Sequence, residues 1–520
     1  MTEYKRKLIE VALPLDAINR ESAREKSIRH GHPSTLHLWW SRKPLAACRA
    51  VLFASLVDDP SAHPDQFPTE EAQERERQRL FGIIEDLVKW ENTTNDDVLR
   101  RAREEILKST GGNPPPVLDP FAGGGSIPLE AQRLGLEAHG SDLNPVAVLI
   151  TKALIEIPPT FAGRSPVNPA DRGRAPGAGW RGAAGLAADV RYYGQWMRDE
   201  AERRIGHLYP KVELPPEQGG GQATVIAWLW ARTVRCPNPA CGAQMPLVRS
   251  FELSKKKGRQ AWVEPIIDRE AKTVSFEVRT GSGKPAEGTK RRGSSRCLVC
   301  GTDSITDATL REQASTHGMG QQLLAIVAEG RTGRVYVTPS EAHVPNVPEP
   351  EATWLDQPMP ENPRWFSPPM YGLETYRKLF TPRQLVALTT FSELVGEARE
   401  RVLADAVAAG LPDDGIRLAD GGVNAPAYAD AVATYLAFVV DRCADFNNGM
   451  TRWVPSNEKV MGAFARQAIP MVWDYPEANI MEHGVGGWPT CLNYVADCIS
   501  ILNPRKSDRG HVRQLDAARS

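Results

Sequence analysis

The chain has 520 residues, enough for about three domains if each takes roughly 150. Its composition, 41% hydrophobic and 24% charged, is typical of a globular protein, and no apolar run reaches the ~20 residues that span a bilayer. The net charge of −1 excludes a polycation, so nucleic acid would have to bind local clusters of Lys and Arg. The charged first thirty residues lack a signal-peptide core, which predicts a cytoplasmic protein without membrane contact.

The segment before residue 110 is expected to be mainly helical. Apolar positions in 1–30 indicate a short packed segment, and the pattern after Pro44 has a helical period with proline near the first turn. Residues 68–110 combine dense charge with apolar positions at helical spacing, which predicts two surface helices. Trp39 and Trp40 precede the Pro44 helix, and two interpretations stay open for them: core aromatics or part of a ligand contact.

The central pattern is a strand, a glycine turn, a helix and a second strand over residues 117–142. Glycine allows a sharp turn and a close approach of backbone to ligand because it has no Cβ. In doubly wound α/β folds, ligands lie at the carboxyl ends of the strands, where an acidic residue ending the second strand accepts ribose hydroxyls. Asp142 has that position. The pattern matches neither a P-loop nor the plain dinucleotide fingerprint.

Two cysteine pairs follow a linker. Residues 160–187 read as a loop, 190–208 as a helix, and 223–234 as a strand that runs into the first pair. Each pair ends in Cys-Gly, and four thiolates so arranged are typical of a zinc ribbon holding one Zn²⁺. The metal ligands expected are Cys236, Cys241, Cys297 and Cys300. Cysteines in a reducing cytosol favour such a site over disulfides.

Strands at 260–267 and 273–279 are predicted between the cysteine pairs, together with basic clusters at 255–259 and 290–292. These clusters have two open interpretations. Either they track nucleic-acid phosphates, which adds sequence-independent and salt-dependent affinity, or they are solvated hairpin tips.

The remaining chain is predicted to be strands and then helices. Residues 311–345 are expected to form further strands, 346–370 a proline-rich connection, and 457–479 a mixed segment. Helices are expected from Pro382, after a Thr381 cap, to about 409, and at 428–447 and 489–502. The tail is polar, and we expect it to be mobile. The predicted domains are therefore 1–160, 161–222, 223–345, 346–502 and 503–520.

Four motifs together resemble one family. They are His32-Pro33-Ser34 with Trp39-Trp40-Ser41-Arg42-Lys43-Pro44, Asp119-Pro120-Phe121-Ala122-Gly123-Gly124-Gly125 with Ser141-Asp142-Leu143-Asn144-Pro145, the first cysteine pair, and Leu379-Phe380-Thr381-Pro382-Arg383-Gln384-Leu385. The chain resembles adenine-specific DNA methyltransferases that contain a zinc ribbon, bacterial and archaeal proteins of which some are associated with phage-defence gene clusters.

The resemblance implies a doubly wound, Rossmann-like α/β fold dependent on S-adenosylmethionine, with an inserted zinc ribbon and a helical C-terminal segment. It implies double-stranded DNA as the partner and methylation of the exocyclic amine of adenine. The cofactor-binding residues that it implies are Lys43, Pro44, Asp119, Pro120, Phe121, Ala122, Gly123, Gly125, Asp142 and Asn144.

One element of that family has no intact copy here. Amine methylation uses Asp/Asn/Ser-Pro-Pro followed by an aromatic residue, which holds and stacks the flipped base. Asn113-Pro-Pro-Pro116 ends in proline and Ser367-Pro-Pro-Met370 in methionine. Our hypothesis is that the chain is the N-terminal portion of such an enzyme, ending about where the strand with the motif is expected, and no catalytic residue is assigned.

Three functions remain open at this stage. The first is an adenine-specific DNA methyltransferase of the restriction-modification type. The second is a catalytically silent subunit of a modification or phage-defence complex, which binds cofactor and DNA while a partner chain supplies the missing motif. The third is an RNA methyltransferase, because single-stranded RNA also suits a zinc ribbon and a base-flipping pocket.

Overall fold

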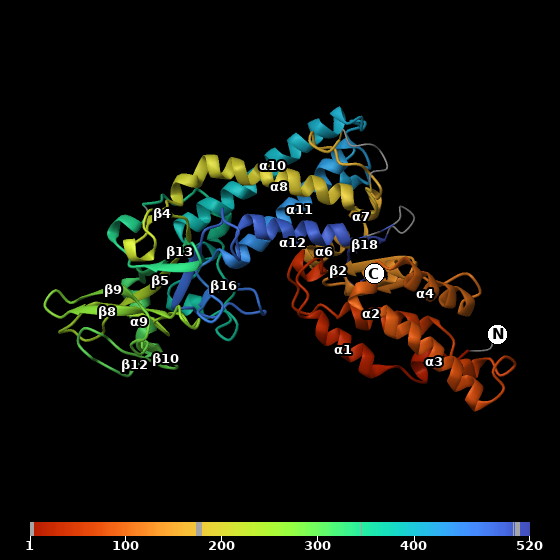
Figure 1. Cartoon of the computed structure of the whole chain (residues 1–520), viewed down its shortest axis with the longest axis horizontal. Helices are drawn as coiled ribbons and strands as arrows, with labels where there is room; N and C mark the ends of the chain where they lie inside the picture. The colour runs from red at the N-terminus through yellow and green to blue at the C-terminus, as the bar shows by residue number, and fades with distance from the viewer. Residues whose placement is uncertain (1–4, 173–178, 345, 503, 505–509, 520) are drawn as a thin grey trace. The chain divides into compact units, whose positions relative to one another are not determined.

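The computed structural model describes residues 5–172, 179–344, 346–502, 504 and 510–519 (Figure 1). The chain divides into two compact units. The first comprises Met1–Gly194, Glu397–Phe438 and Leu492–Ser520, and the second Gln195–Gly396 and Val439–Cys491. In the described part of the chain, no helix is long and apolar enough to cross a membrane.

The first unit begins with four helices and continues into alternating strands and helices. Its elements are α1 (Leu15–Glu25), α2 (Leu45–Leu56), α3 (Glu70–Leu87), α4 (Asp96–Ser109), β1 (Val117–Asp119), α5 (Ser126–Arg133), β2 (Ala138–Asp142), α6 (Pro145–Ile155), α7 (Ile157–Thr160) and β18 (His511–Gln514). The predicted Pro44 helix and the two helices of 68–110 are confirmed as α2, α3 and α4. Caps explain two of the starts: Thr69 accepts from the Ala72 amide, and Asn95 from those of Asp97 and Val98.

The sheet of this unit is parallel, in the order β1-β2-β18. Parallel neighbours need crossover connections, and α5 supplies the one between β1 and β2. The carboxyl ends of all three strands therefore lie at one edge, at Asp119, Asp142 and Gln514. This edge carries the glycine turn. Among the described strands, β1 pairs only with β2. The backbone hydrogen-bonding groups on the other lateral side of β1 therefore face no described strand.

The polar tail differs from the expectation. Residues 511–514 form β18, whose Val512 is buried and pairs with Gly140 of β2. One apolar residue among polar neighbours gives too weak an alternation to predict a strand, and the partner strand lies far away in the sequence. Residues 503 and 505–509 of the tail lie outside the described part of the chain.

Four long helices contribute residues to both units. They are α8 (Ala184–Ile205), α10 (Pro382–Ala408), α11 (Ala425–Phe446) and α12 (Trp488–Ile501), close to the helices expected in these regions. In the first unit, the backbone at Val167 and Asn168, which precede α8, is fixed by the buried Asp189 of that helix. Its carboxylate accepts hydrogen bonds from the amides of Val167 and Asn168 and from the Tyr428 hydroxyl.

The second unit is built on a five-stranded antiparallel sheet, β14-β13-β5-β17 with β6 beside β5. Its strands and one further helix are β3 (Val212–Glu213), β4 (Gln222–Ala223), β5 (Val225–Arg235), β6 (Gln244–Leu247), β7 (Glu252–Ser254), β8 (Ala261–Asp268), β9 (Thr273–Thr280), β10 (Lys290–Arg291), β11 (Ser294–Ser295), β12 (Ile305–Thr306), α9 (Asp307–His317), β13 (Gly320–Gly330), β14 (Gly333–Val337), β15 (Arg452–Val454), β16 (Lys459–Met461) and β17 (Asp474–Ala478). Alternate residues of β5 face two separate apolar cores, with Leu229 in one and Trp228 and Trp230 in the other.

Helix α9 and strand β17 are among the elements of this unit that were not predicted. Residues 311–317, expected to lead into strands, belong to helix α9, which Thr306 caps through the Thr309 amide. Its apolar face is small, only Leu310 and Ala314 being buried, so the helical period was weak. Strand β17 lies within residues 457–479, for which the sequence predicted only a mixed segment.

The Leu-Phe-Thr-Pro-Arg-Gln-Leu motif is a structural junction. Thr381 and Gln384 bond reciprocally at the start of α10, as the predicted cap requires. Glu477 of β17 is buried and accepts from Arg383 at 2.6 Å, from Trp230 at 2.9 Å and from the Thr381 hydroxyl. A buried carboxylate with these donors joins the helix to the sheet.

Candidate functional site

The glycine turn connects β1 to α5 and requires glycine at defined positions. Gly123 and Gly125 have φ values of +51° and +75°, a region that L side chains rarely adopt. A Cβ on Gly123 would lie 2.5 Å from Trp39 Nε1, and one on Gly125 would lie 3.0 Å from Thr151 Oγ1. The turn therefore packs directly against other parts of the first unit.

Asp142 braces this turn from the end of β2. Its Oδ2 accepts from the Gly123 amide at 2.9 Å and its Oδ1 from the Asn144 amide at 2.9 Å. Each carboxylate oxygen has two acceptor sites, so both oxygens retain capacity for a ligand hydroxyl. Asp119 ends β1 and accepts from the Phe121 amide at 3.1 Å. Burial, and then the charge of Asp142, raise the pKa of Asp119.

Apolar side chains are exposed around the same edge. Phe121 is 75% exposed, Leu143 67% and Leu118 66%. Pro120 is half-buried and Ala122 buried, and Asn144 is exposed but caps α6 through the Val146 amide. A group of exposed large apolar residues beside polar acceptors is typical of a surface that contacts a ligand or another segment.

The segment before α2 covers the turn. Ser126 donates its hydroxyl hydrogen to the Lys43 carbonyl at 2.9 Å, and the Arg42 guanidinium donates to the Gly124 carbonyl. Burial lowers the pKa of Arg42 to about 10. Pro44 then precedes the first residue of α2. The structure therefore places the predicted residues Lys43 and Pro44 beside the turn.

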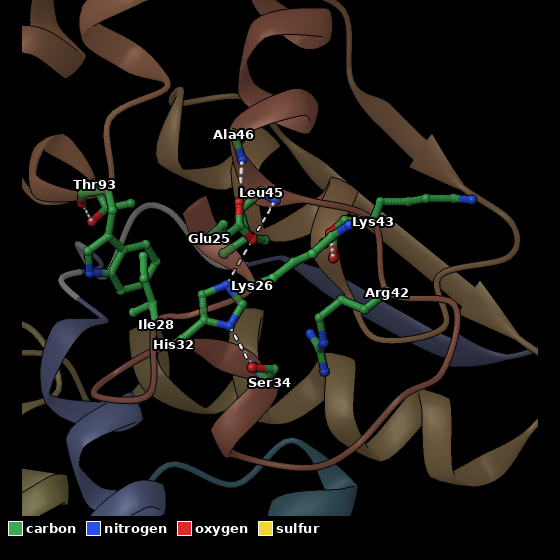
Figure 2. A network of polar contacts seen from close by, with 12 residues as sticks. Glu25, Lys26, Ile28, His32, Ser34, Arg42, Lys43, Leu45, Ala46 and Thr93 are labelled. Carbon is green, nitrogen blue, oxygen red and sulfur yellow. Dashed lines mark hydrogen bonds and ion pairs between the residues drawn. The ribbon is translucent and has the colours of Figure 1, made fainter. Parts of the chain in front are cut away.

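A buried carboxylate holds this covering segment in place, and sequence reasoning missed it. Glu25, 7% exposed, accepts from the amides of Leu45 and Ala46 at 2.9 and 3.0 Å and contacts His32 Nε2 at 2.8 Å (Figure 2). Pro44 has no side chain that can cap α2, so Glu25 satisfies two of the free first-turn amides. Burial raises the pKa of Glu25, but these hydrogen bonds outweigh it and lower the pKa overall.

His32 is part of this support. Its Nδ1 contacts Ser34 Oγ at 2.8 Å while its Nε2 faces Glu25. Figure 2 shows the side chains of Arg42 and Lys43 pointing away from the Glu25 carboxylate. The two parts of the motif therefore have different contacts. His32 of the His-Pro part holds Glu25, which caps α2, and Lys43 of the Lys-Pro part contacts Ser126 at the end of the glycine turn.

The four predicted cysteines come together in the second unit. Their sulfur atoms lie within 4.8 Å of one another, with 3.8 Å between Cys236 and Cys300 and 3.9 Å between Cys241 and Cys297. Tetrahedral Zn–S bonds of ~2.3 Å imply S···S distances of about 3.8 Å, so the arrangement fits a metal ion such as zinc. Gly242 and Gly301, which follow the pairs, have φ values of +63° and +76°.

Several residues of the basic clusters form ion pairs within the protein. Ion pairs join Lys255 to Glu252, Lys256 to Glu458, Lys290 to Asp307 and Arg291 to Glu287. Arg259 donates to the Thr332 carbonyl. The side chains of five of these basic residues are nevertheless exposed: Lys255, Lys257, Arg259, Arg291 and Arg292.

The Ser-Pro-Pro-Met segment packs against an apolar core of the second unit. The Ser367 hydroxyl accepts from the Met471 amide at 2.7 Å, and the buried Tyr371 packs edge-on against Trp473 with ring centroids 4.9 Å apart. These side chains are occupied by packing, so the segment does not present the features of a methylation motif.

The family described as "Protein of unknown function (DUF1156)" matches residues 12–83. The match covers α1, α2 and most of α3, including the Glu25 and His32 support and Lys43, but not the glycine turn or the cysteines. No curated protein and no solved structure is detectably similar to the chain.

Proposed function

We propose that the first unit binds S-adenosylmethionine and that the protein serves methylation of the exocyclic amine of adenine in DNA. The observation that carries the proposal is the Asp142 carboxylate at the carboxyl edge of a parallel sheet, bonded to the Gly123 amide of the glycine turn. Small ligands bind at this edge in α/β proteins, with an acidic group on the ribose.

The cofactor would supply an electrophilic methyl group on sulfonium. Asp142 would accept the ribose hydroxyls, and the exposed Phe121 and Leu143 would flank the adenine. Asp119 would accept polar hydrogens of the methionine part. Lys43 and Pro44, placed by Glu25, would close the methionine side of the turn.

The substrate rests on the resemblance of the motifs, since no residue of the described site selects adenine. The cysteine cluster, which fits a metal, is proposed to hold Zn²⁺ in a ribbon that braces the second unit.

A second function is favoured by two observations: a cofactor-binding subunit without transfer activity of its own. No intact Pro-Pro-aromatic motif occurs in these 520 residues. In the described part, the edge of β1 beside Asp119 pairs with no strand, although parallel strands are normally covered. A strand added there by another segment would bring its carboxyl end beside the turn.

Calorimetric titration with S-adenosylmethionine tests the cofactor site. Asp142→Ala is expected to weaken binding about tenfold to a hundredfold because it removes a charged acceptor. Asp414→Ala is the matched control, since Asp414 also accepts from a nearby amide, that of Ile416, but is exposed elsewhere in the first unit. Equal binding by wild type and Asp142→Ala, both folded by circular dichroism, would contradict the proposal.

Methyl transfer to unmethylated DNA and to RNA separates the candidate functions. Binding with transfer to DNA favours the enzyme. Binding without transfer to either polymer favours the silent subunit. Transfer to RNA alone would overturn the DNA assignment.

A further inference from the structure

One cavity of the first unit is lined by none of the residues of the glycine turn. Its volume is about 680 Å³, within the range of ~300–1,000 Å³ that small-molecule sites occupy. It is lined by α4, the second half of α5, the loops around residues 163 and 181, and the end of α12. Helix α5 begins at the glycine turn and reaches the cavity at its other end, through Gln132 and Arg133.

Arg133 on the wall of this cavity belongs to a buried group of two arginines and one carboxylate, of which Arg49 and Glu130 lie outside the lining. Arg49 and Arg133 share one buried carboxylate, Glu130, at 2.8 and 2.5 Å. The side chain of Arg133 is 9% exposed, and its buried Nη2 has no hydrogen-bond partner among the described residues. Because Glu130 is shared by two guanidiniums and Nη2 of Arg133 has no described acceptor, an anion in the cavity would stabilise this buried group.

Further donors surround the same space. Arg103 and Arg181 also line the cavity, against one acidic residue, Asp96, among the described lining residues. Trp180 contributes a half-buried indole whose Nε1 is buried and without a partner in the described part of the chain. Leucine and isoleucine side chains contribute most of the apolar part of the wall. The cavity thus combines guanidinium donors with an apolar and aromatic surface.

We propose that this cavity binds a nucleotide as a second ligand, separate from the cofactor site. Arginine forks match the oxygens of a phosphate, and the buried Nη2 of Arg133 is a donor without a present acceptor. The indole of Trp180 and the aliphatic wall suit a planar base. The volume admits a mononucleotide. The site belongs to the first unit alone and uses no residue of the proposed cofactor site.

Isothermal titration calorimetry of the full chain with AMP tests this site. Inorganic phosphate and adenosine, the two parts of AMP, are titrated separately for comparison. Wild type is expected to bind AMP saturably and each part at least about tenfold more weakly. Arg181→Gln and Arg133→Gln are expected to weaken AMP binding about tenfold each, the loss of one charged donor. Trp180→Leu is expected to weaken AMP while leaving phosphate unchanged.

The controls distinguish the two sites and a folding defect. Arg20→Gln removes an exposed arginine of α1 outside the cavity and is expected to leave AMP binding unchanged. Asp142→Ala alters only the cofactor site, so it is also expected to retain AMP binding. Arg181 is exposed, so its variant tests the site even if Arg133→Gln unfolds.

Three results would overturn the proposal. They are the absence of saturable AMP binding to wild type, loss of AMP binding in Asp142→Ala with retention in Arg181→Gln, and equal affinity for AMP and phosphate. The second result would place AMP in the cofactor site, and the third would reduce the cavity to a plain anion site.

Discussion

The glycine turn, our proposed cofactor site, and the cysteine cluster, which fits a metal ion, are built in opposite ways. The cluster places four side-chain atoms within 4.8 Å by means of two short loops, each closed by a glycine. The turn offers mainly backbone amides and carbonyls, whose positions depend on Asp142 and on the segment around Lys43. A self-contained site should tolerate changes at a distance, and a supported site should not.

Removal of metal should give the largest effect. If the four thiolates hold Zn²⁺, chelation should destabilise the second unit by on the order of 5 kcal/mol, because metal binding at structural sites contributes directly to folding. Thermal unfolding with and without chelator measures this. A Cys297→Ser, Cys300→Ser double variant is the control, since chelator should not affect it further. If chelation also abolished binding of S-adenosylmethionine, the two sites would not be independent, contrary to our expectation that the glycine turn does not depend on the metal.

Glu25→Gln tests the support of the turn. It removes a buried charge from the first amides of α2, so we expect a loss of about 2 kcal/mol in the free energy of unfolding and weaker cofactor binding. Denaturant unfolding and calorimetry measure the two effects. Glu104→Gln, an exposed carboxylate paired with Arg100, should change neither by more than about 1 kcal/mol. Unchanged cofactor binding in Glu25→Gln would mean that the conformation of the glycine turn does not depend on Glu25.

Gly123→Ala also tests the dependence of the glycine turn on its neighbours, with a smaller expected loss of stability. Alanine at a φ of +51° costs about 1 kcal/mol, and its Cβ would also press on Trp39. Gly111→Ala is matched, because Gly111 has a φ of +63° with open space around it. We expect only Gly123→Ala to weaken binding of S-adenosylmethionine. Equal behaviour of both variants by calorimetry would show that the contact with Trp39 is unimportant.

The pH dependence of Glu25 should give the smallest signal. Its pKa is lowered in the folded state, so its contribution is fully present above about pH 4.5 and is lost as the pH falls through the folded-state pKa. Unfolding free energies of wild type and Glu25→Gln, measured from pH 6 to 3, should therefore converge at low pH. A constant difference across that range would show that the charge of Glu25 does not contribute.

The features that could be predicted from the sequence are those encoded by residues close together in the chain. The two Cys-Gly pairs and the glycine turn before Asp142 are short patterns, and the structure brings each set together. Glu25 was missed because one acidic residue in a charged helix carries no local sign of burial. Strand β18 was missed for a related reason: its pairing with β2 is decided by residues hundreds of positions away. Tertiary contacts of this kind override weak local patterns.

The pairing of β18 with β2 also constrains how the protein is made. On the ribosome, β1 and β2 emerge early, but the third strand of their sheet follows only after the whole second unit has been synthesised. The second unit, once residue 491 has emerged, has its five-stranded sheet complete. Long-range parallel pairing is slow to form and leaves strand edges open meanwhile. The sheet edge that carries the glycine turn is therefore expected to form last, so we expect the nascent first unit to depend on chaperones more than the second unit does.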